Sequence, residues 1–314
     1  MVIYLIKDIA IIFFSIFLET LPFLLLGAFI SALIDVFVSD EMIARMVPKN
    51  IILGSIVGIF LGFFIPACDC AVIPISRRLI KKKVPLNVAV SFMLSSPIIN
   101  PVVLFSTYIA FYSMNPKVLY YRLFLGIIIA LVIGIIIGII FRGKDILIDK
   151  EECEEHCHCH EKSEEDEFLE LEKYTVKSNY FKNKIIDVLK HAGEDFFDVL
   201  KFLMMGALIA SVVQVIIPRS IIDVFSNSSI LSIIVLMLFA YIISLCSTSD
   251  SFVGKSLLSI FDSKGVLAYL ILGPMIDIKN TFVLFGNYKK NFVFTLILLI
   301  FIFVFIFSLG VVVG

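Results

Sequence analysis

Long runs of apolar residues, separated by short polar segments, dominate this 314-residue chain. A helix needs roughly 20 residues to cross about 30 Å of hydrocarbon, and eight runs reach that length. They cover residues 9–38, 51–76, 86–111, 119–141, 193–217, 229–252, 265–286 and 291–313. Prolines and polar residues interrupt several runs, which lipid-facing helices do not tolerate. The pattern predicts an all-α integral membrane protein of about eight transmembrane helices, several of them discontinuous and inside the bundle.

The composition excludes a soluble fold. Hydrophobic residues make up 60% of the chain and charged residues 17%, and the mean hydropathy is +1.05. A water-soluble protein of this size could not hide so much apolar side chain. Six cysteines in such a chain do not form a disulfide scaffold. We therefore expect a cell-membrane protein with the lipid bilayer, and no nucleic acid, as its partner.

One segment holds most of the acidic charge. Residues 151–172 contain eleven acidic residues and one basic residue, although the whole chain has a net charge of only -1. This composition is typical of an exposed linker rather than a membrane segment. We therefore divide the chain into a first transmembrane repeat at 1–141, a cytoplasmic linker at 142–190 and a second transmembrane repeat at 191–314.

The distribution of Lys and Arg predicts an orientation, because positive charge is retained in the cytoplasm. The densest cluster is the five cationic residues at 77–83, and many more lie in the linker. Arg122, Lys289 and Lys290 fall in segments predicted to lie on the other side. Both termini and the linker are accordingly predicted to be cytoplasmic.

The two repeats resemble each other when the chain is shifted by 177 to 179 positions. Residues 21–33 then lie over residues 200–212, with Gly27 on Gly206 and Cys68 on Cys246. Matched Gly, Cys and Pro at a near-constant offset indicate an internal duplication. An even number of spans per half predicts an axis along the membrane normal, whereas an odd number inverts the halves.

Two matched segments place sulfur and oxygen ligands inside apolar runs. The first contains Cys68, Asp69 and Cys70 between two prolines, and the second contains Cys246, Ser247, Thr248 and Asp250. A carboxylate at membrane depth is costly and normally faces a cavity, a partner or a pathway. Each cysteine alone is also compatible with packing, and Ser or Thr with helix bending.

Two further breaks follow in the next run of each half. Ser95, Ser96 and Asn100 lie beside Pro97 and Pro101, while Asp277, Lys279 and Asn280 follow Pro274. Four breaks, two in each half, are typical of secondary transporters, whose substrate sites lie where discontinuous helices meet. The alternative is a proline kink with Asp277 and Lys279 as a neutralising pair.

Two acidic residues in the spans are candidates for a proton relay. Glu19 and Asp198 coincide under the repeat. The alternative for both is a position near the membrane interface.

The linker carries a separate metal-binding candidate. Three cysteines and three histidines fall within eight residues there: Cys153, His156, Cys157, His158, Cys159 and His160. Thiolate and imidazole suit zinc and copper, and the acidic surroundings favour a flexible capture segment over a closed site. We expect no tightly bound cofactor elsewhere.

At these residues the chain resembles the predicted-permease family that includes organoarsenical efflux permeases and heavy-metal efflux permeases. The resemblance rests on PACDCAVIPISRRLIKKKVPLNVAVSFMLSSPIINPVVLFSTY in the first half and on SLCSTSDSF and LGPMIDIKNT in the second. It implies a permease that exports a thiophilic species, with Cys68, Cys70, Cys246, Ser247 and Asp250 at the family's motif positions. This chain has Asp69 and Ala71 where the family pattern has Ser and Gly.

The added carboxylate of Asp69 favours a divalent cation over an uncharged arsenical. We therefore predict a non-enzymatic permease that exports a soft or borderline divalent metal, or a trivalent arsenical, coupled to protons. Cys68, Cys70 and Cys246 would be its ligands, and Asp69 and Asp250 would hold protons. Two alternatives stay open: a membrane thiol oxidoreductase, and a passive metal channel or buffering protein.

Overall fold

The computed structural model describes residues 2–37, 48, 50–65, 69–112, 116–148, 173–216, 229–258 and 260–311, whose regular elements are all helices. The first half contains α1 (Val2–Phe37), α3 (Ile51–Phe64), α4 (Val72–Lys81), α5 (Leu86–Ile99), α6 (Pro101–Phe111) and α7 (Lys117–Ile140). The second half contains α8 (Lys173–Ile216), α10 (Ser229–Ile243), α11 (Ser249–Leu257), α12 (Ser263–Met275), α13 (Ile278–Asn287) and α14 (Lys290–Gly310). The all-α membrane architecture is confirmed, with six helical segments long and apolar enough to span a bilayer and two shorter apolar helices, α3 and α10. Helix α8 begins inside the predicted linker.

The two shorter apolar helices each form one arm of a helical hairpin. In the first half, Gly54 of α3 packs on Asn87 of α5 and Gly62 packs on Ser95, so α3 and α5 run parallel. Helix α4 between them must therefore return the chain, and its Ser76 lies beside Met93. The apolar run at 51–76 thus forms two helices, α3 and α4, that run in opposite directions instead of one helix that crosses once.

The second half repeats this arrangement. Gly265 of α12 packs on Ser232 of α10, while Gly273 faces Asp250 and Gly254 faces Leu270. Helix α10 is therefore parallel to α12 and α11 is antiparallel to it. Each half contributes three spanning segments and one hairpin.

The next break in each half has a local cause. Asn100 precedes Pro101, which disfavours helical geometry in the residue before it, and the Asn100 side chain accepts a hydrogen bond from Val102 N at 3.0 Å. In the second half, Asp277 is extended and its side chain accepts from Asn280 N at 2.6 Å. Both helices that follow a break therefore begin with a capped first turn.

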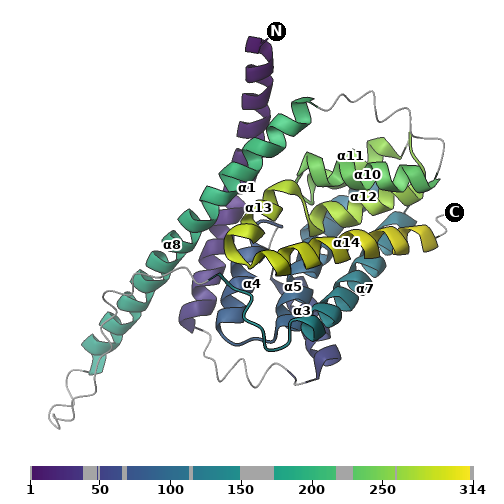
Figure 1. Cartoon of the computed structure of the whole chain (residues 1–314). Coiled ribbons are helices and arrows are strands. Elements are labelled where there is room, and N and C mark those ends of the chain that lie inside the picture. The colour runs from purple at the N-terminus through teal and green to yellow at the C-terminus, as the bar shows by residue number, and fades with distance from the viewer. Residues whose placement is uncertain are drawn as a thin grey trace.

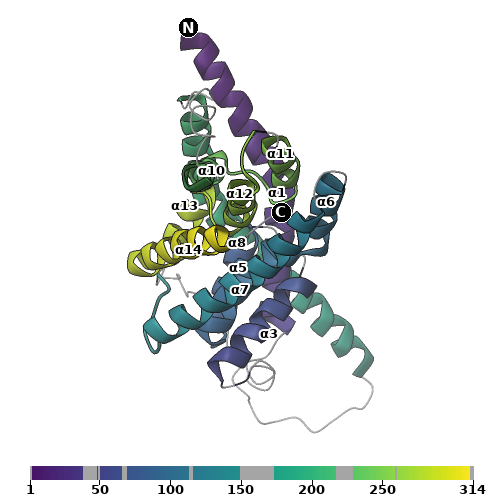
Figure 2. The ribbon, with the colours of Figure 1, turned by 90° about the vertical axis from the view of Figure 1, so that its right-hand side faces the viewer.

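The halves are related by an inverted pseudo-two-fold arrangement. Helices α1 and α8 are antiparallel. Ile16, early in α1, packs on residues late in α8, Ala207 and Ala210. Ser31, late in α1, donates a hydrogen bond to Asp195, which comes earlier in α8. Under the repeat, α4 corresponds to α11 and α6 corresponds to α13. Helix α4 contacts α13, and α11 in turn contacts α6. In both views the α10–α12 group lies above α3, α5 and α7 (Figures 1 and 2). An odd number of spanning segments per half explains the inversion.

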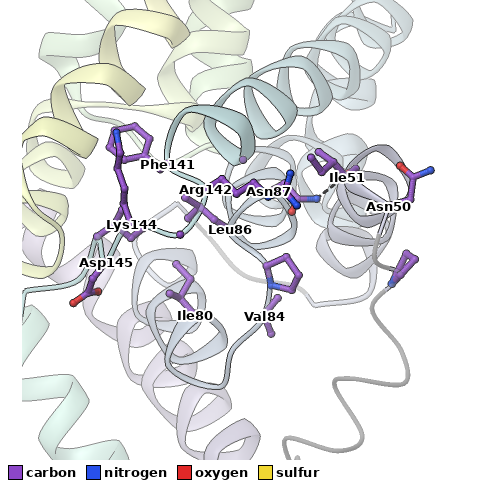
Figure 3. A pocket seen from close by; sticks show the side chains of 15 residues that line it. Asn50, Ile51, Ile80, Val84, Leu86, Asn87, Phe141, Arg142, Lys144 and Asp145 are labelled. Atoms are coloured by element: carbon purple, nitrogen blue, oxygen red, sulfur yellow. Dashed lines mark hydrogen bonds between the residues drawn. The ribbon is translucent and has the colours of Figure 1, made fainter.

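The end of the molecule where the linker departs, here called the linker end, collects several helix ends. Asn50, Ile80, Leu86 and Phe141 line one cavity of about 340 Å³ there (Figure 3). The start of α14 lies at the same end, because Lys289 N donates to Ile146 O at 2.8 Å. The predicted separation of Lys289 and the linker on opposite sides is therefore wrong.

The predicted position of the N-terminus is also corrected. Because α1 and α8 are antiparallel, the first residues of α1 lie at the opposite end from the start of α8 (Figure 1). The C-terminal end of α14 lies at the start of α12, where Lys264 Nζ donates to Leu309 O at 3.3 Å. Three spanning segments per half carry the chain from one end to the other, so neither terminus shares the linker end.

Candidate functional site

A buried lysine joins three of the four chain breaks. Lys279 Nζ lies 3.3 Å from Asp69 Oδ2, at the tip of the first hairpin, and 3.1 Å from Asp277 Oδ2. The same ammonium donates to the carbonyl oxygens of Ser244 at 2.8 Å and Leu245 at 3.5 Å, where α10 ends. All three charged side chains are at most 3% exposed. Groups predicted from three separate sequence segments thus converge at one point.

Neighbouring polar groups support this cluster. Asn280 Nδ2 donates to Asp69 Oδ2 at 3.3 Å, and the other oxygen of Asp277 caps α13. Asp277 Oδ2 faces Lys279 as an ion pair but has no hydrogen-bond partner among the described residues. The Asn280 side-chain oxygen has none there either. The Asn280 side-chain oxygen is thus a buried acceptor without a hydrogen bond among the described residues, whereas Asp277 Oδ2 is held by its ion pair with Lys279.

Two of the three predicted thiols border the cluster. Cys70 is buried, with its sulfur 3.9 Å from Asp69 Oδ2. Cys246 is buried as well, and Thr248 Oγ1 donates to its sulfur at 3.5 Å. Cys70 directly follows Asp69, and Cys246 directly follows Leu245, whose carbonyl oxygen lies 3.5 Å from Lys279 Nζ. Cys68 lies outside the described residues.

The described residues contain no group of three or more Cys, His, Asp or Glu side chains arranged to hold a metal ion. The linker tract with Cys153, His156, Cys157, His158, Cys159 and His160 lies outside the described residues, so its metal binding stays a prediction. At the membrane cluster, the position between the carboxylates is taken by Lys279.

A second buried cluster surrounds Asp250 of α11 and Arg122 of α7. Asp250 Oδ1 accepts a hydrogen bond from Tyr269 OH at 2.9 Å, and Asp250 Oδ2 has no partner among the described side chains. Arg122 of α7 is completely buried; its NH1 donates to Thr107 at 2.6 Å and Ser251 at 2.8 Å. These contacts join α6 and α7 of the first half to α11 and α12 of the second.

Sequence reasoning missed most of this second cluster. It placed Arg122 in a connecting segment, whereas the residue lies inside α7, more than one turn from the start of the helix at Lys117. An arginine at the edge of a strongly apolar run was the available signal, because such a charge is costly in a membrane and is usually functional or paired. Tyr269, Thr107 and Ser251 carried no comparable signal.

Several other predicted site residues form hydrogen bonds that involve backbone groups near the chain breaks. Ser96 Oγ donates to Ile65 O at 3.3 Å, at the hairpin tip, and Ser95 Oγ donates to Phe92 O at 3.4 Å. Asn100 caps α6, and the Ser247 carbonyl accepts from Arg122 at 3.4 Å. These bonds satisfy some of the backbone groups that broken helices leave without partners.

The two candidate relay residues occupy different surroundings. Glu19 Oε1 accepts a hydrogen bond from Ser249 Oγ at 2.8 Å, directly beside Asp250 in the chain. Asp198 lies 3.5 Å from Lys201 Nζ in a largely exposed pair on α8. Glu19 thus has a contact with the residue that precedes Asp250.

The repeat-matched glycines let the long helices approach the hairpins and breaks. A Cβ added to Gly27 would lie 2.9 Å from the Cα of Ala71, and one added to Gly206 would lie 2.7 Å from the Cα of Lys279. Side chains at these positions would therefore force α1 away from the first hairpin and α8 away from the α12–α13 break.

Together the clusters hold three buried carboxylates, those of Asp69, Asp250 and Asp277, and two buried cations, Lys279 and Arg122. When every group is ionised, one negative charge is left over. An uncompensated buried charge is strongly unfavourable. The arrangement therefore suits a site that takes up a proton or a cation.

A sequence model of a family described as "Predicted permease" matches residues 5–313. The chain belongs to this family. The permease is 39% identical over 286 residues to the protein named "UPF0718 protein YcgR" of Bacillus subtilis, covering 91% of this chain and 90% of that protein. It is 37% identical to the "Putative two-component membrane permease complex subunit" of Streptococcus mutans, covering 91% and 89%. No solved structure matches the permease.

Proposed function

We propose that this permease exports a thiophilic metal or metalloid species, with the cluster around Lys279 as its substrate site. The single observation that carries the proposal is the convergence of Asp69, Cys70, Cys246, Asp277 and Lys279 at the tips of broken helices. Soft or borderline metals prefer sulfur ligands, and transport sites lie where discontinuous helices of two repeats meet. Membership of a permease family supports transport rather than catalysis.

We infer that export is coupled to protons. The clusters carry one more carboxylate than cations, so a proton can neutralise the site when substrate is absent. Glu19 accepts a hydrogen bond from Ser249, the residue before Asp250 in the chain, and is the candidate for the proton relay. Binding of a metal by thiols releases protons, so the two processes share the same groups.

We propose that the linker end faces the cytoplasm of the cell. The cationic residues at 77–83 lie near this end, as do Arg142, Lys144 and Lys289, and positive charge is retained inside. Both termini then face outward, because each half crosses the membrane three times.

The test is Cd²⁺ uptake by inverted membrane vesicles that contain the permease. Cys246→Ser keeps the size of the side chain but removes a soft ligand, so uptake should be lost while the amount of protein in the membrane is unchanged. Thr295→Ser, at an exposed hydroxyl on α14, serves as the control and should retain uptake. Wild-type uptake by Cys246→Ser would refute a thiol site, and loss of the pH gradient without an effect on uptake would refute proton coupling.

A further inference from the structure

We propose that Lys279 is a tethered competitor whose ammonium group occupies the position that a positively charged substrate takes. The inference deepens the proposed function and rests on it for the location of the site. It adds two statements: the transported species binds as a cation, and it binds by displacing the Lys279 side chain.

The surroundings of Lys279 Nζ resemble the oxygen shell of a bound cation. Two carboxylate oxygens lie at 3.1 and 3.3 Å, and two backbone carbonyl oxygens lie at 2.8 and 3.5 Å. These four oxygens come from three separate segments of the chain. Unwound backbone carbonyls of broken helices are the groups that coordinate ions in other transporters. The cage thus suits a small cation as well as an ammonium group.

The two carboxylates of Asp69 and Asp277 can be neutralised by the Lys279 ammonium or by a substrate cation, and these two cations compete for the same position. Asp69 and Asp277 are both fully buried, and Lys279 is the cation that contacts both of them. Withdrawal of the ammonium alone would leave two carboxylates uncompensated in a low-dielectric interior, which is strongly unfavourable. A divalent cation neutralises both carboxylates, whereas an uncharged ligand neutralises neither. Displacement of Lys279 therefore selects for a cationic substrate, and return of Lys279 assists release.

The first half shows that a helix can begin after such a chain break without a lysine in its first turn. Asn100 caps α6 as Asp277 caps α13, but the repeat offset of 177 places the apolar Val102 opposite Lys279. Both breaks are capped, yet only the second carries the Asp277 and Lys279 pair. A role confined to holding the broken helix together does not explain this difference.

The side chain can move while its backbone stays fixed. The Cα of Lys279 packs against Gly206 of α8, and the residue lies in the first turn of α13. A lysine ammonium sits on a flexible four-carbon stem. In the proposed exchange the side chain of Lys279 changes rotamer, while its backbone stays beside Gly206.

Calorimetric titration of the full-length permease in lipid nanodiscs tests the inference, with Cd²⁺ as the cationic probe and arsenite as the uncharged probe. Lys279→Gln removes the competitor, so Cd²⁺ binding should tighten by about tenfold or more, with arsenite binding unchanged. Lys201→Gln removes a charge from an exposed position on α8 and should alter neither. Unchanged or weaker Cd²⁺ binding to monodisperse Lys279→Gln protein would overturn the inference.

A second measurement uses the unmodified chain and does not depend on the folding of a variant. Acylation of lysines, followed by mass spectrometry, should show increased modification of Lys279 when Cd²⁺ is bound, with Lys264 as the internal reference. No increase at saturating Cd²⁺ would contradict displacement.

The two proposals can fail separately. If Cys246→Ser removes the component of Cd²⁺ binding that does not depend on residues 153–160, and Lys279→Gln leaves that component unchanged, the thiol site stands and the tethered competitor falls. If Lys279→Gln tightens Cd²⁺ binding and Cys246→Ser has no effect, the competitor stands and the thiol site falls.

Discussion

Replacement of Gly206 by Ala should damage the permease out of proportion to the single added carbon. The new Cβ would lie 2.7 Å from Lys279 Cα and 2.9 Å from Lys279 O, where ordinary contact begins at 3.4 Å. The obstacle is backbone, so no flexible side chain can yield. Helix α8 and the start of α13 must separate by about 0.7 Å to restore ordinary contact.

The expected cost is that of overpacking a well-packed interior, about 1 to 3 kcal/mol of the free energy of unfolding. The same helix provides a matched control, because a Cβ at Gly193 meets nothing within 4 Å. Glycine destabilises a helix interior relative to alanine, so Gly193→Ala should raise the free energy of unfolding by about 0.5 to 1 kcal/mol. The free energy of unfolding should therefore fall in Gly206→Ala and rise in Gly193→Ala.

Unfolding of the purified variants in detergent measures stability, and Cd²⁺ uptake by inverted vesicles measures function. A shift of the Lys279 backbone moves the centre of the proposed site, so uptake by Gly206→Ala should fall by about tenfold or more. Gly193→Ala should transport like the wild type. Equal stability and equal uptake in the two variants would refute the close approach of α8 to the site.

Three further predictions test the scaffold and the linker. Asp195→Ala removes the carboxylate that accepts two hydrogen bonds from the largely buried Arg78 of α4, at 2.8 and 3.0 Å, and should lower the free energy of unfolding by about 3 kcal/mol. Asp145→Ala breaks an exposed ion pair with Lys289 and should lower it by less than about 1 kcal/mol. Equal losses of stability would contradict the argument that burial sets the cost. A cysteine placed at Lys289 should be protected from impermeant thiol reagents in intact cells and one at Lys117 labelled, and the reverse pattern would invert the proposed orientation. Deletion of residues 153–160 should lower the amount of metal bound by purified protein without changing its unfolding midpoint, and loss of folded protein would show the tract to be structural.

The helical architecture was predictable because apolar runs and prolines act locally. The breaks after Pro97 and near Pro274 follow from backbone chemistry, and the repeat was visible in matched Gly27 and Gly206. The hairpins were not predictable, because a mainly apolar run of 26 residues at 51–76 is compatible with one crossing or with a turn back. That single ambiguity also caused the errors in orientation.

The candidate site was predictable only where a residue is out of place in an apolar run. Asp69, Asp277 and Lys279 met that criterion, and the structure brings them together. Tyr269 and Ser251 did not, since a tyrosine or serine in a membrane helix is ordinary by itself. Their place beside Asp250 and Arg122 depends on how the halves pack, which no local pattern encodes.

The short pairing between residues 145–148 and residues 287–289 has a consequence for the linker. Ile148 N donates to Asn287 O at 3.2 Å, and Leu147 pairs with Tyr288, so the chain leaves the folded body at a fixed point. Cys153 follows five residues later, and covalent geometry limits that stretch to roughly 18 Å. Any ion held by the Cys and His tract is thereby kept at an effective concentration on the order of millimolar beside the linker end. A tract that binds metal as predicted would therefore hold its ion beside the linker end, at a distance set by the length of the tether.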